Sequence, residues 1–182
     1  MRKIKGKSLM TAAEIDLALA RMAAEIVEKL GPVEEFAVVG IRRRGVPLAR
    51  RLCRRIEAAV KRPVPLGILD ITLYRDDLTA IGNRPMLRET LIDFDIDGRS
   101  LVLVDDVLYT GRTVRSALDG LVDLGRPRRV QLAVLIDRGH RELPIQADYV
   151  GKTVQTEEGD TVEVRLEEED GEERVVLLRR GA

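Results

Sequence analysis

The sequence predicts an α/β fold in which a mostly parallel central sheet is flanked by helices, with a β-hairpin at the C-terminal end. Three apolar runs, residues 36–41, 101–104 and 130–136, have the length and composition of strands buried on both faces. Segments with helical spacing alternate with these runs, which is typical of a parallel sheet. With 182 residues, 45% of them hydrophobic, the chain is expected to form a single domain, residues 1–182, with a sizeable core.

The first helix is predicted after Thr11, because Thr11 and Glu14 have the spacing of a capping box. Apolar residues then recur at helical spacing until the Gly-Pro pair at 31–32 stops the segment. These apolar residues are Ile15, Leu19, Met22, Ile26 and Leu30. Residues 36–41 follow as a short buried strand, and residues 46–60 as a helix whose arginines line its polar side.

The middle of the chain predicts a further strand and a long loop. Residues 64–74 are β-branched and apolar in a way that suits a strand. Residues 75–89 carry charge, glycine and proline without periodicity, and a loop of this length inside a compact domain is typical of a lid over a reaction site. A β-hairpin and a solvated insertion are the alternatives for this segment. Residues 112–124 are predicted as a helix closed by Gly125.

The C-terminal segment, residues 154–182, is predicted as an acidic β-hairpin extension. Residues 155–180 read as alternating strands, and residues 167–173 as an acidic turn that contains glycine. Residues 155–182 hold ten acidic and four basic residues, a net charge of −6, so the preceding part of this neutral chain carries +6. We expect the hairpin to cover an edge of the core.

Composition excludes several classes of protein. A single cysteine, Cys53, rules out an intramolecular disulfide framework, and a single histidine rules out a His-rich metal site. The N-terminal residues are basic but no apolar stretch follows them, and nowhere do eighteen apolar residues run together. We therefore expect a cytoplasmic protein without membrane contact.

The most informative segment is residues 101–113, LVLVDDVLYTGRT, in which a buried strand ends in two acids and a Thr/Gly turn opens a helix. Unpaired backbone N–H groups, hydroxyls and the positive helix end suit a terminal phosphate. Neighbouring carboxylates would repel that phosphate and are better matched to sugar hydroxyls. The segment therefore predicts a site for a phosphorylated ribose. The alternative is a solvated acid pair that only caps the helix.

Two further strand ends provide candidate binding groups. Residues 42–45, Arg-Arg-Arg-Gly, join a strand to a helix, where guanidinium groups and turn amides can bind a second anion, and we expect Arg43 and Arg44 to contact it. The alternative is a solvated cluster that continues the basic helix face. Asp137 and Arg138 follow the strand at 130–136, where side-chain and backbone groups can hold a base.

Residues 101–113 resemble the signature motif of the type I phosphoribosyltransferases. Four further stretches extend the resemblance to the bifunctional pyrimidine-operon attenuator and uracil phosphoribosyltransferase family. They are GIRRRGVPLA at 40–49, DITLYRDDL at 70–78, GRPRRVQLAVL at 125–135 and DRGHRELPIQADYVGK at 137–152. The similarity covers about residues 12–152, so it implies the type I phosphoribosyltransferase fold.

The resemblance implies two activities: conversion of uracil and phosphoribosyl pyrophosphate to UMP and pyrophosphate, and binding of leader mRNA to attenuate pyrimidine genes. Asp105 and Asp106 would be the catalytic residues, and Mg²⁺ would be carried mainly by the substrate and not by a protein metal site. Phosphoribosyl pyrophosphate would contact Arg43, Arg44, Asp105, Asp106, Val107, Leu108, Tyr109, Thr110, Gly111, Arg112 and Thr113. Asp137 and Arg138 would bind uracil.

Members of this family are expected to form at least a homodimer. We assign RNA contacts to Arg21, Arg141 and Lys152, although exposed basic residues are often only solvated. Two alternatives remain for the function. One is a pure nucleotide sensor, which would bind UMP and RNA without transferring a ribosyl group, and the other is a purine salvage phosphoribosyltransferase without RNA binding.

Overall fold

The computed structural model describes residues 6–30, 35–76 and 89–179, and it confirms the α/β fold. A parallel five-stranded sheet has the order β3-β2-β4-β5-β6. Its strands are β2 (Phe36–Ile41), β3 (Leu66–Leu69), β4 (Ser100–Leu108), β5 (Arg129–Asp137) and β6 (Tyr149–Thr153). A smaller antiparallel sheet has the order β1-β8-β7 and consists of β1 (Gly6–Thr11), β7 (Thr161–Arg165) and β8 (Arg174–Leu178).

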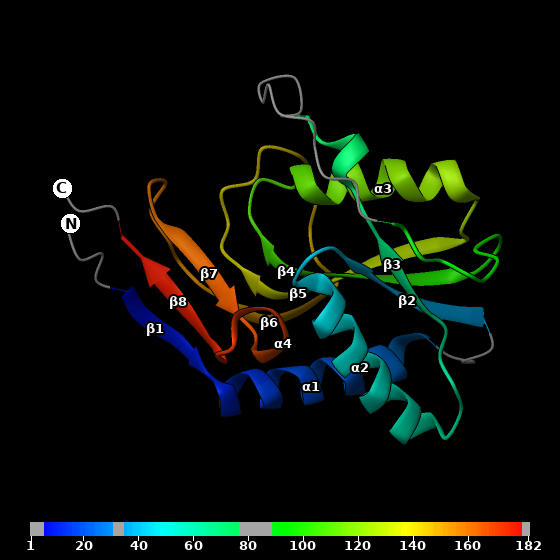
Figure 1. Ribbon diagram of the computed structural model, residues 1–182, viewed down its shortest axis with the longest axis horizontal. Coiled ribbons are helices and arrows are strands. Elements are labelled where there is room, and N and C mark those ends of the chain that lie inside the picture. Colours follow the sequence, from blue (N-terminus) through cyan, green and yellow to red (C-terminus); the bar gives the residue numbers. More distant parts are fainter. Residues whose placement is uncertain (1–5, 31–34, 77–88, 180–182) are drawn as a thin grey trace.

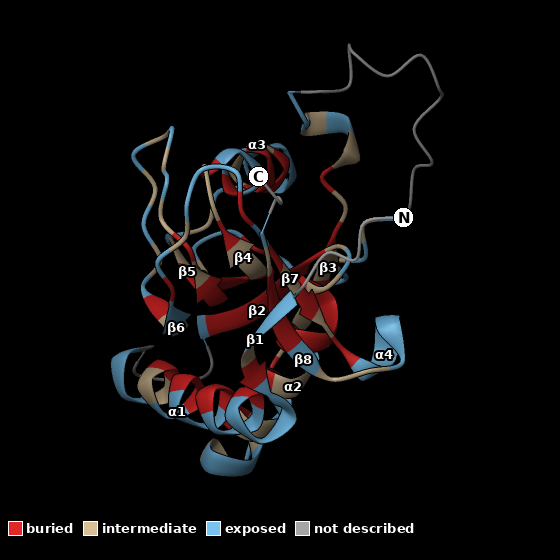
Figure 2. Ribbon diagram, turned by 90° about the vertical axis from the view of Figure 1, so that its left-hand side faces the viewer, coloured by how far each residue is buried: buried red, intermediate tan, exposed pale blue. Residues whose placement is uncertain are grey.

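Helices cover both faces of the large sheet (Figure 1). The helices α1 (Ala12–Leu30) and α2 (Gly45–Val60) lie on one face and α3 (Arg112–Leu124) on the other. The strands contribute to two cores, because alternate residues of β4 point in opposite directions: Val102 packs with α1 and α2, while Leu101 and Leu103 pack with α3. Figure 2 shows the buried strands between helices whose outer faces are exposed.

The order of the strands determines where a ligand can bind. The chain passes from β2 outward to β3, and then returns to the other side of β2 to form β4. The carboxyl ends of β2 and β4 are therefore a topological switch point, the position at which open parallel sheets bind ligands. Both the basic segment 42–45 and the acid pair of β4 lie at this edge.

Several predicted elements are confirmed with close boundaries. Thr11 and Glu14 form the capping box of α1: the Glu14 carboxylate accepts the Thr11 N–H at 2.8 Å, and the Thr11 hydroxyl accepts the Glu14 N–H at 3.3 Å. The helices predicted at 46–60 and 112–124 correspond to α2 and α3. The small residue Cys53 is buried in α2.

The strand predicted at 64–74 is wrong beyond Leu69. The Asp70 carboxylate accepts hydrogen bonds from the Thr72 N–H at 2.9 Å and from the Thr72 hydroxyl, which turns the chain into a short 3₁₀ helix, η2 (Thr72–Tyr74). Most of the lid predicted at 75–89 lies outside the described residues. In contrast, β4 is longer than predicted and pairs with β5 as far as Leu108, so that the acid pair lies within the strand.

Besides η2, three elements were not predicted: β1, β6 and the short helix α4 (Glu167–Asp170). β1 is mostly exposed and has no apolar alternation, but it pairs along β8 from Gly6 opposite Leu178. The predicted C-terminal hairpin is present as β7 and β8, and α4 occupies its acidic turn. None of the described helices is long and apolar enough to cross a membrane.

Candidate active site

A cleft of about 560 Å³ opens at the switch point between β2 and β4. Its walls combine guanidinium groups, carboxylates and hydroxyls, so it suits a ligand with both phosphate and sugar groups. The lining residues are Arg42, Arg43, Arg44, Asp70, Ile71, Thr72, Arg75, Asp105, Asp106, Val107 and Thr113.

The basic turn, residues 42–45, is held directly against the end of β4. A Cβ atom on Gly45 would collide with the carbonyl oxygen of Val104 and would lie 3.3 Å from the Cα atom of Asp105. Only glycine permits this approach, which brings the first turn of α2 beside the acid pair. Within that turn the Val46 N–H donates to the Arg43 carbonyl oxygen at 3.2 Å, and Pro47 has no N–H. The peptide bond between Arg42 and Arg43 is cis.

The acid pair has two different environments. Asp105 is buried, whereas Asp106 is partly exposed in the cleft. The Asp105 carboxylate accepts the Asp106 N–H at 2.9 Å, and the Asp106 carboxylate accepts the Val107 N–H at 2.9 Å. Burial, and then the nearby charge of Asp106, raise the pKa of Asp105 well above the usual range for this side chain. In the protonated form Asp105 can donate a hydrogen bond to a sugar oxygen.

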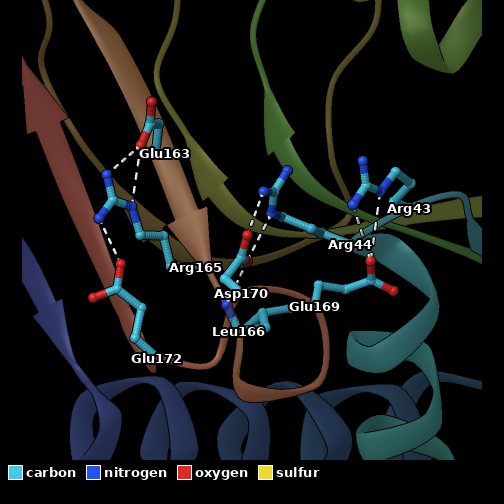
Figure 3. Close-up of polar contacts among 8 residues, drawn as sticks. All are labelled: Arg43, Arg44, Glu163, Arg165, Leu166, Glu169, Asp170 and Glu172. Carbon is cyan, nitrogen blue, oxygen red and sulfur yellow. Dashed lines mark hydrogen bonds and ion pairs between the residues drawn. The ribbon is translucent and has the colours of Figure 1, made fainter.

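The arginines of the basic turn all have partners in the protein. Arg42 donates from Nε and Nη2 to the Glu89 carbonyl oxygen, at 3.2 and 2.9 Å. Arg44 donates from Nε and Nη2 to the two carboxylate oxygens of Asp170, at 3.1 and 2.7 Å, and Arg43 reaches Glu169 at 3.5 Å (Figure 3). Acidic residues of α4 therefore lie next to the turn that we expect to bind an anion.

The predicted phosphate turn follows β4. Gly111 has φ of +93°, a backbone conformation that favours glycine, and it caps α3. The Thr110 carbonyl accepts the N–H groups of Glu142 and Leu143 at 2.9 and 3.1 Å, which connects this turn to the segment after β5. The Arg112 guanidinium binds the Glu142 carboxylate at 2.6 Å, and this bond raises the pKa of Arg112.

Asp137 and Arg138 have different surroundings at the end of β5. The Asp137 carboxylate accepts the Gly139 N–H at 3.0 Å and an Arg141 N–H at 2.6 Å. Arg138 is buried, with its guanidinium carbon 4.0 Å from the centre of the Tyr109 ring and its Nη1 atom 2.9 Å from the Asp160 carbonyl oxygen. Its Nε atom is buried without a hydrogen-bond partner among the described residues, so it is a donor that a ligand could use.

The cleft contains only some of the predicted contact residues for phosphoribosyl pyrophosphate. Those that line it are Arg43, Arg44, Asp105, Asp106, Val107 and Thr113. Arg112 and Thr113 also line a smaller hollow of about 150 Å³, and Leu108, Tyr109, Thr110 and Gly111 connect the two regions along the chain. Neither Asp137 nor Arg138 lines the large cleft.

Five lining residues were not predicted: Arg42, Asp70, Ile71, Thr72 and Arg75. A signal for Asp70 was present in the sequence, since it follows the apolar residues 66–69 as Asp105 follows 101–104. The strand predicted at 64–74 includes Asp70, so the end of the strand was not recognised at that residue. Arg42 belongs to the same arginine run as Arg43 and Arg44.

The residues assigned to RNA form bonds within the chain. Arg21 donates to the carbonyl oxygens of Val150 and Gly151 at 2.9 and 2.6 Å, and Lys152 donates to the Leu9 carbonyl oxygen at 2.8 Å. Arg141 binds the Tyr109 carbonyl oxygen at 3.0 Å as well as Asp137. These bonds give each side chain a structural role, and contact with RNA stays a prediction.

Comparison with known proteins places this arrangement in context. Residues 7–169 match the phosphoribosyl transferase domain. The chain is 61% identical over 172 residues to the bifunctional protein PyrR of Thermus thermophilus, covering 94% of this chain and 95% of that protein. It is 62% identical over 161 residues to the bifunctional protein PyrR of Pelotomaculum thermopropionicum, covering 88% and 89%.

Solved structures show the same fold at low sequence identity. A hypoxanthine-guanine phosphoribosyltransferase from Bacillus anthracis superposes with a TM-score of 0.70 at 18% identity, covering 98% of this chain and 100% of that one. A hypoxanthine phosphoribosyltransferase from Trypanosoma cruzi superposes with a TM-score of 0.71 at 20% identity, covering 99% and 100%. At these identities the likeness establishes the fold and leaves the base open.

Proposed function

The chain belongs to the phosphoribosyltransferase family and, within it, to the bifunctional PyrR proteins, and on this premise we propose a double function. As an enzyme it is a uracil phosphoribosyltransferase that converts uracil and phosphoribosyl pyrophosphate to UMP and pyrophosphate. As a regulator it binds leader mRNA in response to UMP and attenuates transcription of pyrimidine biosynthesis genes, which places it in the cytoplasm. The observation that carries the enzymatic proposal is the single cleft shared by Asp105, Asp106 and the basic turn.

The reaction is a displacement at C1 of the ribose. A uracil nitrogen forms the new bond to C1 and gives up its proton to the surroundings, the bond from C1 to the pyrophosphate oxygen breaks, and pyrophosphate leaves with the electron pair. Asp105 and Asp106 hold the ribose hydroxyls and stabilise the positive charge that develops on the sugar, while residues 109–113 hold the 5-phosphate. The protein therefore contributes position and electrostatic stabilisation.

Mg²⁺ fits this cleft as an ion that accompanies the substrate. Among the described residues no group of three or more His, Cys, Asp or Glu side chains could form a protein cage for a metal. Mg²⁺ commonly binds through substrate phosphates with one or two carboxylates, and Asp105 and Asp106 provide two carboxylates in the lining of the cleft. When bound, the ion offsets the negative charge of the pyrophosphate.

We place the uracil after β5, where Asp137 and Arg138 would hold it. The Nε atom of buried Arg138 has no hydrogen-bond partner in the described part of the chain, and this supports the placement because a base carbonyl could accept its hydrogen bond. The Tyr109 ring contacts both Arg138 and His140, and Tyr109 comes directly before Thr110 of the predicted phosphate turn. A base at this position would therefore be close to the ribose site. The purine alternative is not favoured, because the relatives at 61–62% identity are PyrR proteins.

The first experiment measures pyrophosphate release with Mg²⁺, phosphoribosyl pyrophosphate and one of five bases: uracil, orotate, hypoxanthine, guanine or adenine. We expect release with uracil alone. The double variant Asp105→Asn with Asp106→Asn should reduce turnover by about a thousandfold or more. Release with a purine would overturn the assigned base, and unchanged turnover of the double variant would overturn the assigned acids.

Regulation is tested separately by thermodynamic linkage. If UMP strengthens leader RNA binding by some factor, the same RNA must strengthen UMP binding by that factor. Calorimetric titration of UMP with and without leader RNA measures this directly, and light scattering tests the expected dimer or larger homo-oligomer. A protein that binds UMP and RNA cooperatively but releases no pyrophosphate would be a sensor without transferase activity.

A further inference from the structure

The acidic helix α4 lies in the C-terminal hairpin, far along the chain from the basic turn, yet it binds the side chains of that turn (Figure 3). We propose that Asp170 is a positioning residue for pyrophosphate binding: it holds the Arg44 side chain and thereby fixes the basic turn at the start of α2. The inference rests on the proposed function and adds a residue of the C-terminal hairpin to the site.

The geometry of the Arg44 pair carries the proposal. Nε and Nη2 of Arg44 meet separate carboxylate oxygens of Asp170, at 3.1 and 2.7 Å, which is the bidentate arrangement that restricts a guanidinium most strongly. Arg44 is also the residue that caps α2, so restraint of its side chain acts directly on the backbone of the basic turn, whose arginines line the cleft. Because the Arg44 guanidinium is paired with Asp170, Arg44 fixes the position of the turn and does not provide an unpaired positive charge.

Asp170 is itself firmly anchored. One of its carboxylate oxygens also accepts the N–H of Leu166 at 2.9 Å, and its own N–H donates to the Leu166 carbonyl oxygen at 2.7 Å. Leu166 is completely buried in the main core. A continuous path of contacts therefore runs from the core through Asp170 and Arg44 to the basic turn. The hydrogen bond from Arg44 lowers the pKa of Asp170, so the carboxylate stays ionised at neutral pH.

The neighbouring pair has the opposite character. The Nε and Nη2 atoms of Arg43 each lie 3.5 Å from the Oε2 atom of Glu169, which is the limit of a hydrogen bond. The Arg43 side chain is 55% exposed. A pair this long and exposed is weak. Arg43 can therefore leave Glu169 and move to an arriving pyrophosphate, whereas Arg44 stays with Asp170. Arg43 therefore binds the negative charge of the pyrophosphate, and Arg44 holds the turn in place.

A further ion pair supports the docking of the hairpin on α2. Arg51 lies further along α2, where it binds Glu168 through Nε at 2.9 Å and also binds Glu173. These contacts lie outside the cleft lining, so they keep the hairpin in place when a single bond of the Arg44 pair is altered.

The test compares Asp170→Asn with Glu172→Gln by calorimetric titration of magnesium pyrophosphate. Both variants remove one negative charge from the hairpin, but Glu172 pairs with Arg165 and Arg174 and does not contact the basic turn. We expect Asp170→Asn to weaken pyrophosphate binding and to raise KM for phosphoribosyl pyrophosphate by about tenfold, with KM for uracil unchanged. Glu172→Gln should match the wild type.

Further variants separate positioning from general destabilisation. In an Arg44→Gln background, Asp170→Asn should cause no additional loss, because its effect passes through Arg44. Glu169→Gln should not weaken pyrophosphate binding. If Asp170→Asn does not fold, Asp170→Glu keeps the charge but shifts the carboxylate by one methylene, and it should show a loss of several-fold that the charge alone would not predict.

The outcomes are distinct. Unchanged pyrophosphate affinity in Asp170→Asn or, if that variant does not fold, in Asp170→Glu would overturn the inference. Tighter binding would overturn it too, because it would make α4 a competitor of the substrate. A wild-type protein that binds neither pyrophosphate nor phosphoribosyl pyrophosphate would instead remove the proposed function itself.

Discussion

Asp105 is placed where its charge opposes stability. It is 6% exposed and next to a second carboxylate, and burial and that neighbour raise its pKa in the folded protein. In strongly acidic solution Asp105 is protonated whether the chain is folded or not. As the pH rises, the unfolded chain releases this proton first, so the free energy of unfolding falls until the pH passes the raised folded-state pKa. At neutral pH the buried position of Asp105 in the site therefore lowers the free energy of unfolding.

Asp105→Asn should accordingly stabilise the ligand-free protein at neutral pH while reducing transfer activity. An increase of 1 kcal/mol in the free energy of unfolding would raise Tm by about 2–4 °C for a chain of this size. The gain should shrink toward zero near pH 4 and below. Thermal unfolding at a series of pH values measures it, and Asp93→Asn, at an exposed site, is the control. A pH-independent difference would contradict the assigned cause.

Arg141 connects three parts of the site. It donates to the carbonyl oxygens of Tyr109 and Ile145 and to the Asp137 carboxylate, at 3.0, 2.8 and 2.6 Å. Its guanidinium is thus a brace between the phosphate turn and the segment after β5. This placement gives a reason for an arginine at position 141 that does not need RNA.

Arg141→Ala should lower both Tm and UMP affinity, because the brace is lost. RNA affinity will also fall, but the slope of log K against log salt distinguishes the cause. A lost phosphate contact reduces that slope by about 1, whereas a lost brace leaves it unchanged. Arg54→Gln, on the exposed face of α2, is the control for a change of one positive charge. A reduced slope in Arg141→Ala alone would establish the RNA contact.

The basic turn depends on one close contact between elements. A Cβ on Gly45 would collide with the Val104 carbonyl oxygen at the end of β4. Gly45→Ala should therefore push α2 away from the acid pair, lower stability by about 1–3 kcal/mol and raise KM for phosphoribosyl pyrophosphate. Gly120→Ala in α3 is the matched control, since its Cβ would meet only side chains at 3.3 Å or more and alanine favours a helix. Equal effects of both substitutions would contradict the contact.

Elements were predictable where one pattern dominates. The capping box and apolar spacing predicted α1, and the uniform apolar runs predicted β2 and β5, because each of these patterns lies within the segment itself. β1 was missed because its stability comes from pairing with β8, which lies at the other end of the chain. The strand after residue 64 was predicted too long because one side chain, Asp70, turns the backbone.

At the level of the whole molecule, the C-terminal hairpin shares the main core. Buried residues of β7 and β8, including Val164 and Val175, belong to the same cluster as residues of α1 and α2. We therefore predict one cooperative unfolding unit for residues 1–182. Hydrogen exchange should show β8 amides exchanging with the same free energy of opening as those of α1. Exchange of β8 at a much lower free energy would make the hairpin a separate unit.

The fold class and the family could be predicted from the sequence alone, and the sequence also located the acid pair and the Thr/Gly turn, for which phosphate binding stays a prediction. Each of these features depends on residues that are neighbours in the sequence, because strand length, helix capping and the geometry of a Thr/Gly turn are local properties. Local patterns also predicted that acids and arginines end two neighbouring strands, and parallel pairing places both at the same edge of the sheet.

Which of these side chains share a cleft, and what holds them there, follows from the arrangement of the elements in space. Asp70 lines the large cleft, whereas Asp137 and Arg138 do not. Arg44 and Asp170 are 126 positions apart, and no local pattern pairs them. The physical reason is that ion pairs and close packing depend on distances between elements, which the chain acquires only when its sheets and helices assemble around a common core.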